Sequence, residues 1–150
     1  TIAPLTETFP GFDVVDAYQT QLVNVQRRVG AGEVVRGHKV GLSAKAMQQM
    51  LGVHEPDYGH LFDSMFVFES DEVAAARFCQ PRAEIEVAFV LGNPVTAVAW
   101  RANKVATFGV SLEPGHVVLP GSCTRMVPVG AGDVVRAEFD QLGHVSVRFT

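Results

Sequence analysis

The apolar positions of residues 13–32 repeat with the period of an α-helix. Asp13, with Asp16 three residues further on, is a candidate N-cap. Apolar side chains then recur on one helical face at Val15, Tyr18, Leu22, Val25 and Val29. Gly30 and Gly32 interrupt this periodicity, and we therefore predict that the helix ends there.

A short strand and a second helix are predicted next. The β-branched residues and flanking glycines of residues 34–41 are typical of a strand. Ser43 is a candidate cap for a helix over residues 44–51, which Gly52 would close. Residues 54–60 are polar and contain Pro and Gly, so we predict a loop there.

The second half of the pattern is rich in strands. Residues 61–68 are expected to be extended, and residues 83–91 are predicted to form a strand. Asn93 and Pro94 are a favourable cap and first residue for a helix that ends at Gly109. Further strands are predicted at 116–119, 134–139 and 145–149, separated by turns at 130–133 and at Gly143. This order indicates an α+β fold in one domain, 1–150, with a helical N-terminal part (1–52) and a β-rich core (53–150).

Composition narrows the class of protein. The chain has 150 residues, of which 47% are hydrophobic and 19% charged, so it can fill a core. Its net charge of −4 and the lack of a Lys/Arg cluster argue against nucleic acid as a partner. No apolar run is long enough for a membrane span, and no leader segment is recognisable. Cys79 and Cys123 do not form a paired pattern, so we expect buried, reduced thiols in a cytoplasmic protein.

Glu84 and Glu86 are the most informative pair of residues. Residues i and i+2 of a strand point to the same face, so the two carboxylates are predicted to lie side by side. Such a pair is costly in an apolar setting unless a cation compensates it, and Mg²⁺ or Mn²⁺ prefers oxygen ligands. From the tripeptide alone, a strand face exposed to solvent is the better explanation of the pair.

Other polar residues are ambiguous by themselves. Lys39 could stabilise an enolate or move a proton beside a bound metal, or it could be an ordinary surface lysine. Gly121 and Ser122 follow an apolar run and could offer a hydroxyl and N–H groups to a carboxylate, or form a plain turn. The histidines show neither HxH nor HExxH spacing, and most of them are expected in loops or at the surface.

Taken together and in order, these fragments resemble the fumarylacetoacetate hydrolase superfamily, in the group of 2-hydroxypenta-2,4-dienoate (2-keto-4-pentenoate) hydratases and 4-oxalocrotonate decarboxylases. The resemblance covers nearly the whole chain, and its specificity comes from the combination of segments. The segments are GHKVGLS (37–43), AMQQMLGV (46–53), EPDYG (55–59), PRAEIEVAF (81–89), GNPVTAVAW (92–100), LPGSCT (119–124) and GD (132–133).

The resemblance implies a site and an activity. Glu84 and Glu86 match the family's metal ligands, Lys39 its active-site lysine, and Asp57 an acidic residue near the site. Gly121 and Ser122 match a turn that lines the substrate pocket. The implied fold has a mixed β-roll core of the fumarylacetoacetate hydrolase C-terminal-domain type with a small helical N-terminal part. The implied reaction is the Mg²⁺- or Mn²⁺-dependent hydration of a 2-hydroxy-2,4-dienoate from meta-cleavage of aromatic or steroid rings.

The chain departs from the family's pattern in one respect. Members of the group are longer, and their third metal carboxylate lies in a segment after the E-x-E strand. Here Leu91 and Gly92 run straight into Asn93 and Pro94, which match a region much later in the family. Either the protein contains a further segment near 91–93, or the chain is a shortened relative.

Two other roles stay open. A decarboxylase of 4-oxalocrotonate-type 2-oxo-3-enedioates needs the same metal and the same enolate. A non-catalytic partner subunit of a complex between pathway enzymes would explain the missing third carboxylate. By resemblance, we also expect a homo-oligomer that acts on a small 2-hydroxydienoate or 2-oxo acid.

Overall fold

The computed structural model describes residues 2–69, 71–92 and 111–150. Its helices are α1 (Leu5–Thr8), α2 (Val14–Gly30) and α3 (Lys45–Leu51), with 3₁₀ turns η1 (Asp63–Met65) and η2 (Ala75–Arg77). Its strands are β1 (Val35–Gly41), β2 (Asp57–Phe62), β3 (Glu72–Val73), β4 (Arg82–Ala83), β5 (Phe89–Val90), β6 (Val117–Leu119), β7 (Val127–Pro128), β8 (Val134–Phe139) and β9 (Gly143–Phe149). The helix predicted from Asn93 to Gly109 lies outside the described residues.

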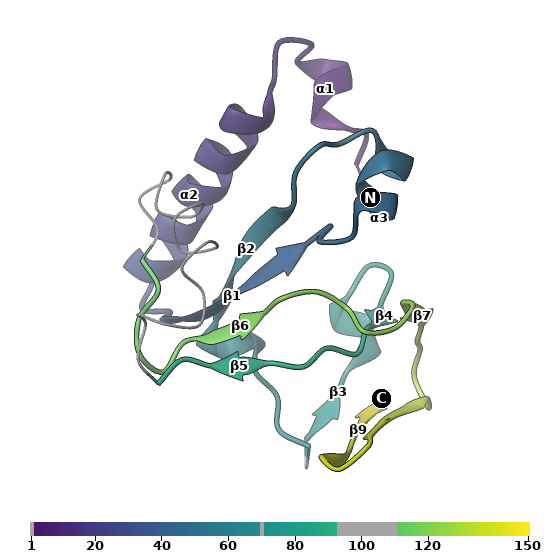
Figure 1. Cartoon of the computed structure of the whole chain (residues 1–150). Coiled ribbons are helices and arrows are strands. Elements are labelled where there is room, and N and C mark those ends of the chain that lie inside the picture. The colour runs from purple at the N-terminus through teal and green to yellow at the C-terminus, as the bar shows by residue number, and fades with distance from the viewer. Residues whose placement is uncertain (1, 70, 93–110) are drawn as a thin grey trace.

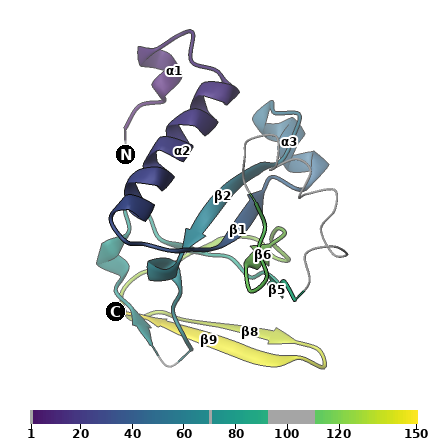
Figure 2. The ribbon, with the colours of Figure 1, turned by 90° about the vertical axis from the view of Figure 1, so that its left-hand side faces the viewer.

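The strands form small mixed sheets, which confirms the α+β class (Figure 1). The largest has the order β2-β1-β6-β5, in which β1 pairs antiparallel with β2 and parallel with β6. A second sheet has the order β3-β9-β8, and β4 pairs with β7. In Figure 2 the β8–β9 hairpin lies at the end of the molecule away from α1.

Helix α2 forms as its sequence predicts and packs on the β1–β2 face. Asp13 accepts hydrogen bonds from the N–H groups of Val15 and Asp16, and the Asp16 side chain accepts from the Asp13 N–H, which completes a capping box. Tyr18 is buried and stacks on Tyr58 of β2, with ring centroids 4.6 Å apart. Val15 and Val29, by contrast, are exposed, because only the middle of the helix lies against the sheet.

Three local predictions in the first half of the chain are wrong at least in part. Residues 57–60 were expected in a loop but belong to β2, because residues 57–62 all pair with β1 in an antiparallel ladder. Ser43 does not cap α3; the N-cap is Ala44, which has no side-chain capping bond, while Gly52 closes the helix in the left-handed conformation as predicted. The extended stretch expected at 61–68 is interrupted by η1.

The predicted strand 83–91 is also wrong as a continuous element. Regular pairing is confined to β4 and β5, and residues 84–88 between them lie outside any ladder. Cys79 and Cys123 are not joined in a disulfide, and both are exposed rather than buried as expected, since they lie in bends of connecting segments. In the part of the chain that the structure describes, no helix has the length and hydrophobicity needed to cross a bilayer.

The core of the described residues is thin. One cluster joins Tyr18 and Tyr58, and another joins Val73, Ala75 and Phe149. Many large apolar side chains stay exposed, among them Phe89 and Val90 on β5, which are 52% and 70% exposed. An exposed apolar strand at a sheet edge is a surface that proteins usually cover.

Candidate active site

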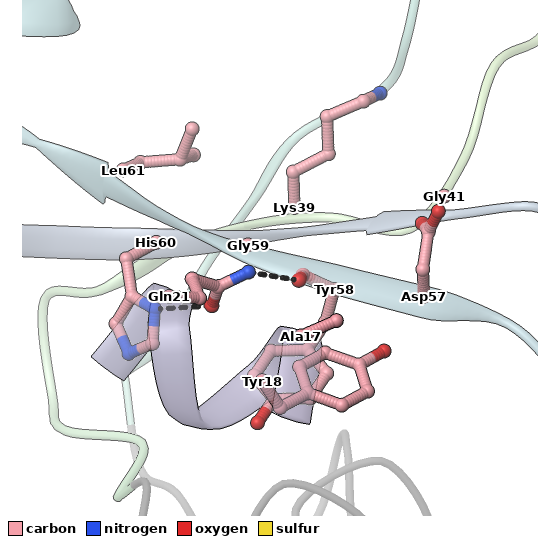
Figure 3. Close-up of a pocket in the computed structure, with 10 residues that line it drawn as sticks. All are labelled: Ala17, Tyr18, Gln21, Lys39, Gly41, Asp57, Tyr58, Gly59, His60 and Leu61. Carbon is pink, nitrogen blue, oxygen red and sulfur yellow. Dashed lines mark hydrogen bonds between the residues drawn. The ribbon is translucent and has the colours of Figure 1, made fainter. Parts of the chain in front are cut away.

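Lys39 lies at the centre of β1, on the sheet face opposite α2. The burial pattern of β1 places His38 and Val40 on the face that α2 covers, because their ladder partners His60 and Tyr58 contact that helix. Lys39 points the other way, as does Leu61 on β2 (Figure 3). The ammonium group therefore lies on the face of the sheet that α2 does not cover, which we call the open face.

Glu84 and Glu86 converge on this lysine. Lys39 Nζ donates a hydrogen bond to Glu86 Oε1 and another to Glu84 Oε2, 3.3 Å away. The Glu86 side chain is 5% exposed, whereas those of Glu84 and Lys39 are 29% and 37% exposed. Burial lowers the pKa of Lys39, but the hydrogen bond and charge of Glu86, followed by those of Glu84, outweigh it and leave this pKa raised. The lysine is therefore held as a cation between two carboxylates.

The Gly121–Ser122 turn completes the cluster. Ser122 Oγ donates a hydrogen bond to Glu86 Oε1 over 3.2 Å. The next residue, Cys123, donates its N–H to the carbonyl oxygen of Ile85 over 2.8 Å, so this turn runs alongside the segment that carries the two glutamates. Gly121 has φ +133°, a conformation that favours glycine, and a Cβ there would collide with Ser43 Oγ.

Asp57 lies on the same sheet face but is not part of the ion cluster. It is the ladder partner of Gly41, and a Cβ on Gly41 would collide with Asp57 Oδ1. No hydrogen bond or ion pair joins Asp57 to Lys39, Glu84 or Glu86 in the described interactions. Asp57 is thus a neighbour at the rim of the site.

The carboxylate pair can be tested for its fit to a divalent cation. Glu86 Oε2 is buried and has no hydrogen-bond partner among the described residues, which is costly for a carboxylate oxygen. Two carboxylates and a nearby hydroxyl are hard oxygen donors, and Mg²⁺ is commonly held by one or two carboxylates with its remaining positions filled by water or substrate. The residues therefore fit such an ion, although residues 2–69, 71–92 and 111–150 contain no group of three or more His, Cys, Asp or Glu side chains that could hold one.

A depression of about 410 Å³ lies along the outer edge of β2 (Figure 3). Lys39, Asp57, Gly59 and Leu61 line it on the open face of the sheet. Tyr18, Gln21, Tyr58 and His60 line it on the helix side. The depression therefore reaches the lysine from the side away from β6.

Three of the five histidines, most of which were expected in loops or at the surface, form a cluster on the opposite face of the sheet. The ring of His38 is 3% exposed and lies 4.9 Å from that of His60 and 5.4 Å from that of His116, measured between centroids. Burial, followed by the charges of His60 and His116, lowers the pKa of His38 to about 4. Only the ladder, which sets His38 against His60, could have revealed this cluster.

Comparison with known proteins places this site in context. The chain is 25% identical to 2-oxo-hept-4-ene-1,7-dioate hydratase of Escherichia coli, in an alignment that covers 99% of the chain and 91% of that protein. It is 28% identical to 2-hydroxyhexa-2,4-dienoate hydratase of Comamonas testosteroni, with 100% and 91% covered. A stretch of 92 residues is 47% identical to 2-keto-4-pentenoate hydratase of Paraburkholderia xenovorans, which is 61% of this chain and 34% of that protein. No protein-family model matches the chain.

The fold matches a solved enzyme. The structure superposes on 4-oxalocrotonate decarboxylase from Pseudomonas putida G7, complexed with magnesium and adipate, with a TM-score of 0.93. The match covers 99% of this chain and 90% of that one at 20% identity, so it establishes the fold alone. The fold and the lysine–carboxylate cluster thus define an α+β protein of the 4-oxalocrotonate decarboxylase fold. The chain is thus similar along nearly its full length to hydratases of the group that its sequence resembles, and it shares the fold of 4-oxalocrotonate decarboxylase.

The alignments also bear on the length of the chain. The alignment with the Escherichia coli hydratase runs over 243 positions, but the chain has 150 residues. At least 93 positions (243 less 150) of that relative therefore face no residue of this chain.

Proposed function

We propose that this protein is a hydro-lyase that hydrates a 2-hydroxy-2,4-dienoate to a 4-hydroxy-2-oxo acid during meta-cleavage catabolism of aromatic or steroid rings. The observation that carries the proposal is the Lys39–Glu84–Glu86 cluster, found in a chain whose relatives along nearly its full length are named hydratases. The protein would act in the cytoplasm as a homo-oligomer that associates with neighbouring pathway enzymes.

Glu84 and Glu86 would hold a divalent cation, Mg²⁺ or Mn²⁺. The unpartnered Glu86 Oε2 and the hard oxygen donors support this assignment, as do the magnesium and calcium in solved proteins of this fold. When bound, such an ion supplies Lewis-acid stabilisation of an enolate. Ser122 would keep Glu86 in position through its hydroxyl, and the Gly121–Ser122 turn would offer polar groups to the substrate's carboxylate.

Lys39 would supply a positive charge close to the substrate and would transfer a proton to it. Its ammonium group on the open face can stabilise the negative charge that develops on the substrate oxygen. It can also donate a proton from Nζ as the dienol rearranges. Asp57, at the rim, would orient the water that adds to the conjugated double bond.

The complete protein would have the β-roll core of the fumarylacetoacetate hydrolase C-terminal domain. We place the positions that lack a counterpart in the chain near residues 91–93, after β5. The exposed Phe89 and Val90 support this placement, because a further segment beyond Leu91 could cover them. A third metal carboxylate would lie in that segment.

A decarboxylase is the alternative that the fold match favours, since the solved neighbour is named 4-oxalocrotonate decarboxylase. A non-catalytic partner subunit is favoured by the absence of a third ligand within the described residues. Both alternatives keep the Lys39–Glu84–Glu86 cluster, so measurements of enzymatic activity are needed to distinguish them from the hydratase.

The test is the loss of ultraviolet absorbance of 2-hydroxypenta-2,4-dienoate with added Mg²⁺ or Mn²⁺. We expect metal-dependent loss for the wild type and little for Glu84→Gln, with Glu7→Gln on α1 as a matched control. No turnover by the wild type would sink the hydratase proposal and favour the partner subunit. Carbon dioxide release from 4-oxalocrotonate, without hydration of the dienoate, would favour the decarboxylase.

A further inference from the structure

The open face of the sheet has a polar end and an apolar end. At the Gly41 end lie Asp57 and Ser43, together with the Gly121–Ser122 turn that packs on Ser43. At the other end, Gly37 has Leu61 and Val117 as its ladder partners. Lys39 stands between the two ends, so a ligand lying along β1 meets polar groups on one side of the ammonium and hydrocarbon on the other.

Free space beside Lys39 lies toward β2. The ladder partner of Lys39 on that strand is Gly59, and a Cβ built on Gly59 meets nothing within 4 Å. At Gly37 and Gly41, by contrast, a Cβ would collide with Val117 and Asp57. The depression of about 410 Å³ runs through this space, from Asp57 past Gly59 to Leu61.

Few of the described side chains that line this space can carry a positive charge. Among the described residues that line the depression, Lys39 and His60 alone can carry positive charge. Lys39 lies beside Glu84 and Glu86, where the proposed function uses its charge at the substrate's reacting oxygen rather than at the tail. His60 is turned to the helix side, where a hydrogen bond joins its Nδ1 to Gln21 Oε1, and burial lowers its pKa. Within the described lining of the depression, no further cation is left to receive a second carboxylate, and Asp57 adds a negative charge.

We infer that the substrate's tail is uncharged, a hydrogen or a short alkyl group that lies over Gly59 toward Leu61, and that substrates with a terminal carboxylate are disfavoured. This inference rests on the proposed function and specifies the substrate class of that site. Relatives of both kinds exist, since one is named for a heptenedioate and another for a hexadienoate. The Gly59–Leu61 side of the depression would discriminate between them.

The test compares kcat/KM for 2-hydroxyhexa-2,4-dienoate and 2-oxo-hept-4-ene-1,7-dioate. We expect the wild type to prefer the hexadienoate by about tenfold or more, since a carboxylate left without a partner loses that much. Leu61→Arg should reduce this preference about tenfold by supplying a cation, whereas Leu61→Gln, polar but uncharged, should not. Gly59→Ala, which has space for its methyl group, should reduce activity toward the hexadienoate more than toward the pentadienoate.

The outcomes separate the two proposals. Equal use of both substrates by the wild type, or an equal effect of Leu61→Gln and Leu61→Arg, would overturn the uncharged tail but leave the hydratase standing. If no substrate is turned over, the proposed hydratase function is refuted. The inference about the substrate's tail is then tested by calorimetry, which compares the binding of 2-oxopentanoate with that of 2-oxoadipate. Tighter binding of 2-oxopentanoate supports the inference, and tighter or equal binding of 2-oxoadipate refutes it. Thermal unfolding of each variant confirms that it is folded.

Discussion

Gly121 and Ser43 approach so closely that a Cβ atom on the glycine would collide with Ser43 Oγ. The contact joins the turn that carries Ser122 to the connection between β1 and α3. It therefore fixes the position of Ser122 relative to β1.

Gly121→Ala is expected to disturb this contact. The methyl group meets Ser43, and φ +133° is unfavourable for alanine, so the free energy of unfolding should fall by about 1–3 kcal/mol. Urea denaturation measures the loss. Gly30→Ala, at the end of α2 with open space, is the control and should change stability by less than about 1 kcal/mol. Equal stabilities of the two variants would contradict the close contact.

Lys39→Met should destabilise the protein as well as inactivate it. Glu86, whose side chain is 5% exposed, would lose its cation, and we expect a cost of about 1–3 kcal/mol in urea denaturation. Adding Glu86→Gln should restore part of this stability, because the unpaired buried charge is then removed. Lys45→Met on α3 is the control. A double variant less stable than Lys39→Met would argue against a compensating ion pair.

Metal binding should depend on both glutamates. Titration with Mn²⁺, followed by electron paramagnetic resonance of the free ion, should show binding to the wild type and strong weakening in Glu84→Gln and Glu86→Gln. Ser122→Ala should weaken binding less, by about tenfold, since Ser122 only positions Glu86. Glu7→Gln should bind as the wild type does. Binding that survives both glutamate substitutions would place the metal elsewhere.

Acid should destabilise the fold through His38. Its pKa is about 4 in the folded chain and near 6.5 when unfolded, so between these values the unfolded state binds the extra proton. Stability should therefore fall as the pH drops from 6.5 to 4, by up to about 3 kcal/mol from this residue. His38→Phe should flatten the dependence of urea stability on pH, whereas the exposed His144→Gln should not. Identical pH profiles for wild type and His38→Phe would contradict the lowered pKa.

The mass of the intact protein tests the segment proposed near residues 91–93. These 150 residues have a mass of 16.2 kDa, and 93 further residues in proportion would add about 10 kDa. We expect the larger mass. A mass near 16.2 kDa would establish a shortened relative, in which the metal site has to work with Glu84 and Glu86.

The sequence correctly predicted the elements whose determining residues lie within the element or next to it. Helix α2 has its capping box and apolar face within seventeen residues, and β1 has its β-branched residues. Strand β2 was missed because Pro56, Asp57 and Gly59 are typical of loops, and only pairing with β1 makes the segment extended. Tertiary pairing here outweighs local preference.

The sequence predicted that Glu84 and Glu86 lie close together, but for a partly wrong reason. Glu84 and Glu86 were expected side by side on a strand face, but their segment is irregular, and what brings them together is the shared hydrogen-bonding to Lys39. The bond from Ser122 to Glu86 could not be predicted, since it depends on how residues 121–124 run along residues 84–86. Contacts between segments that are far apart in the chain can be identified only when the fold is known.

The parallel pairing of β1 with β6 has a consequence for how the protein folds. It sets Lys39 opposite Leu119, residues that are 80 positions apart in the chain (119 less 39). Closing so large a loop must precede assembly of the site, and non-local pairing of this kind slows folding. A growing chain therefore carries Lys39 and both glutamates long before Ser122 emerges. Until then the half-formed sheet leaves the side of β1 that later receives β6 open to other strands.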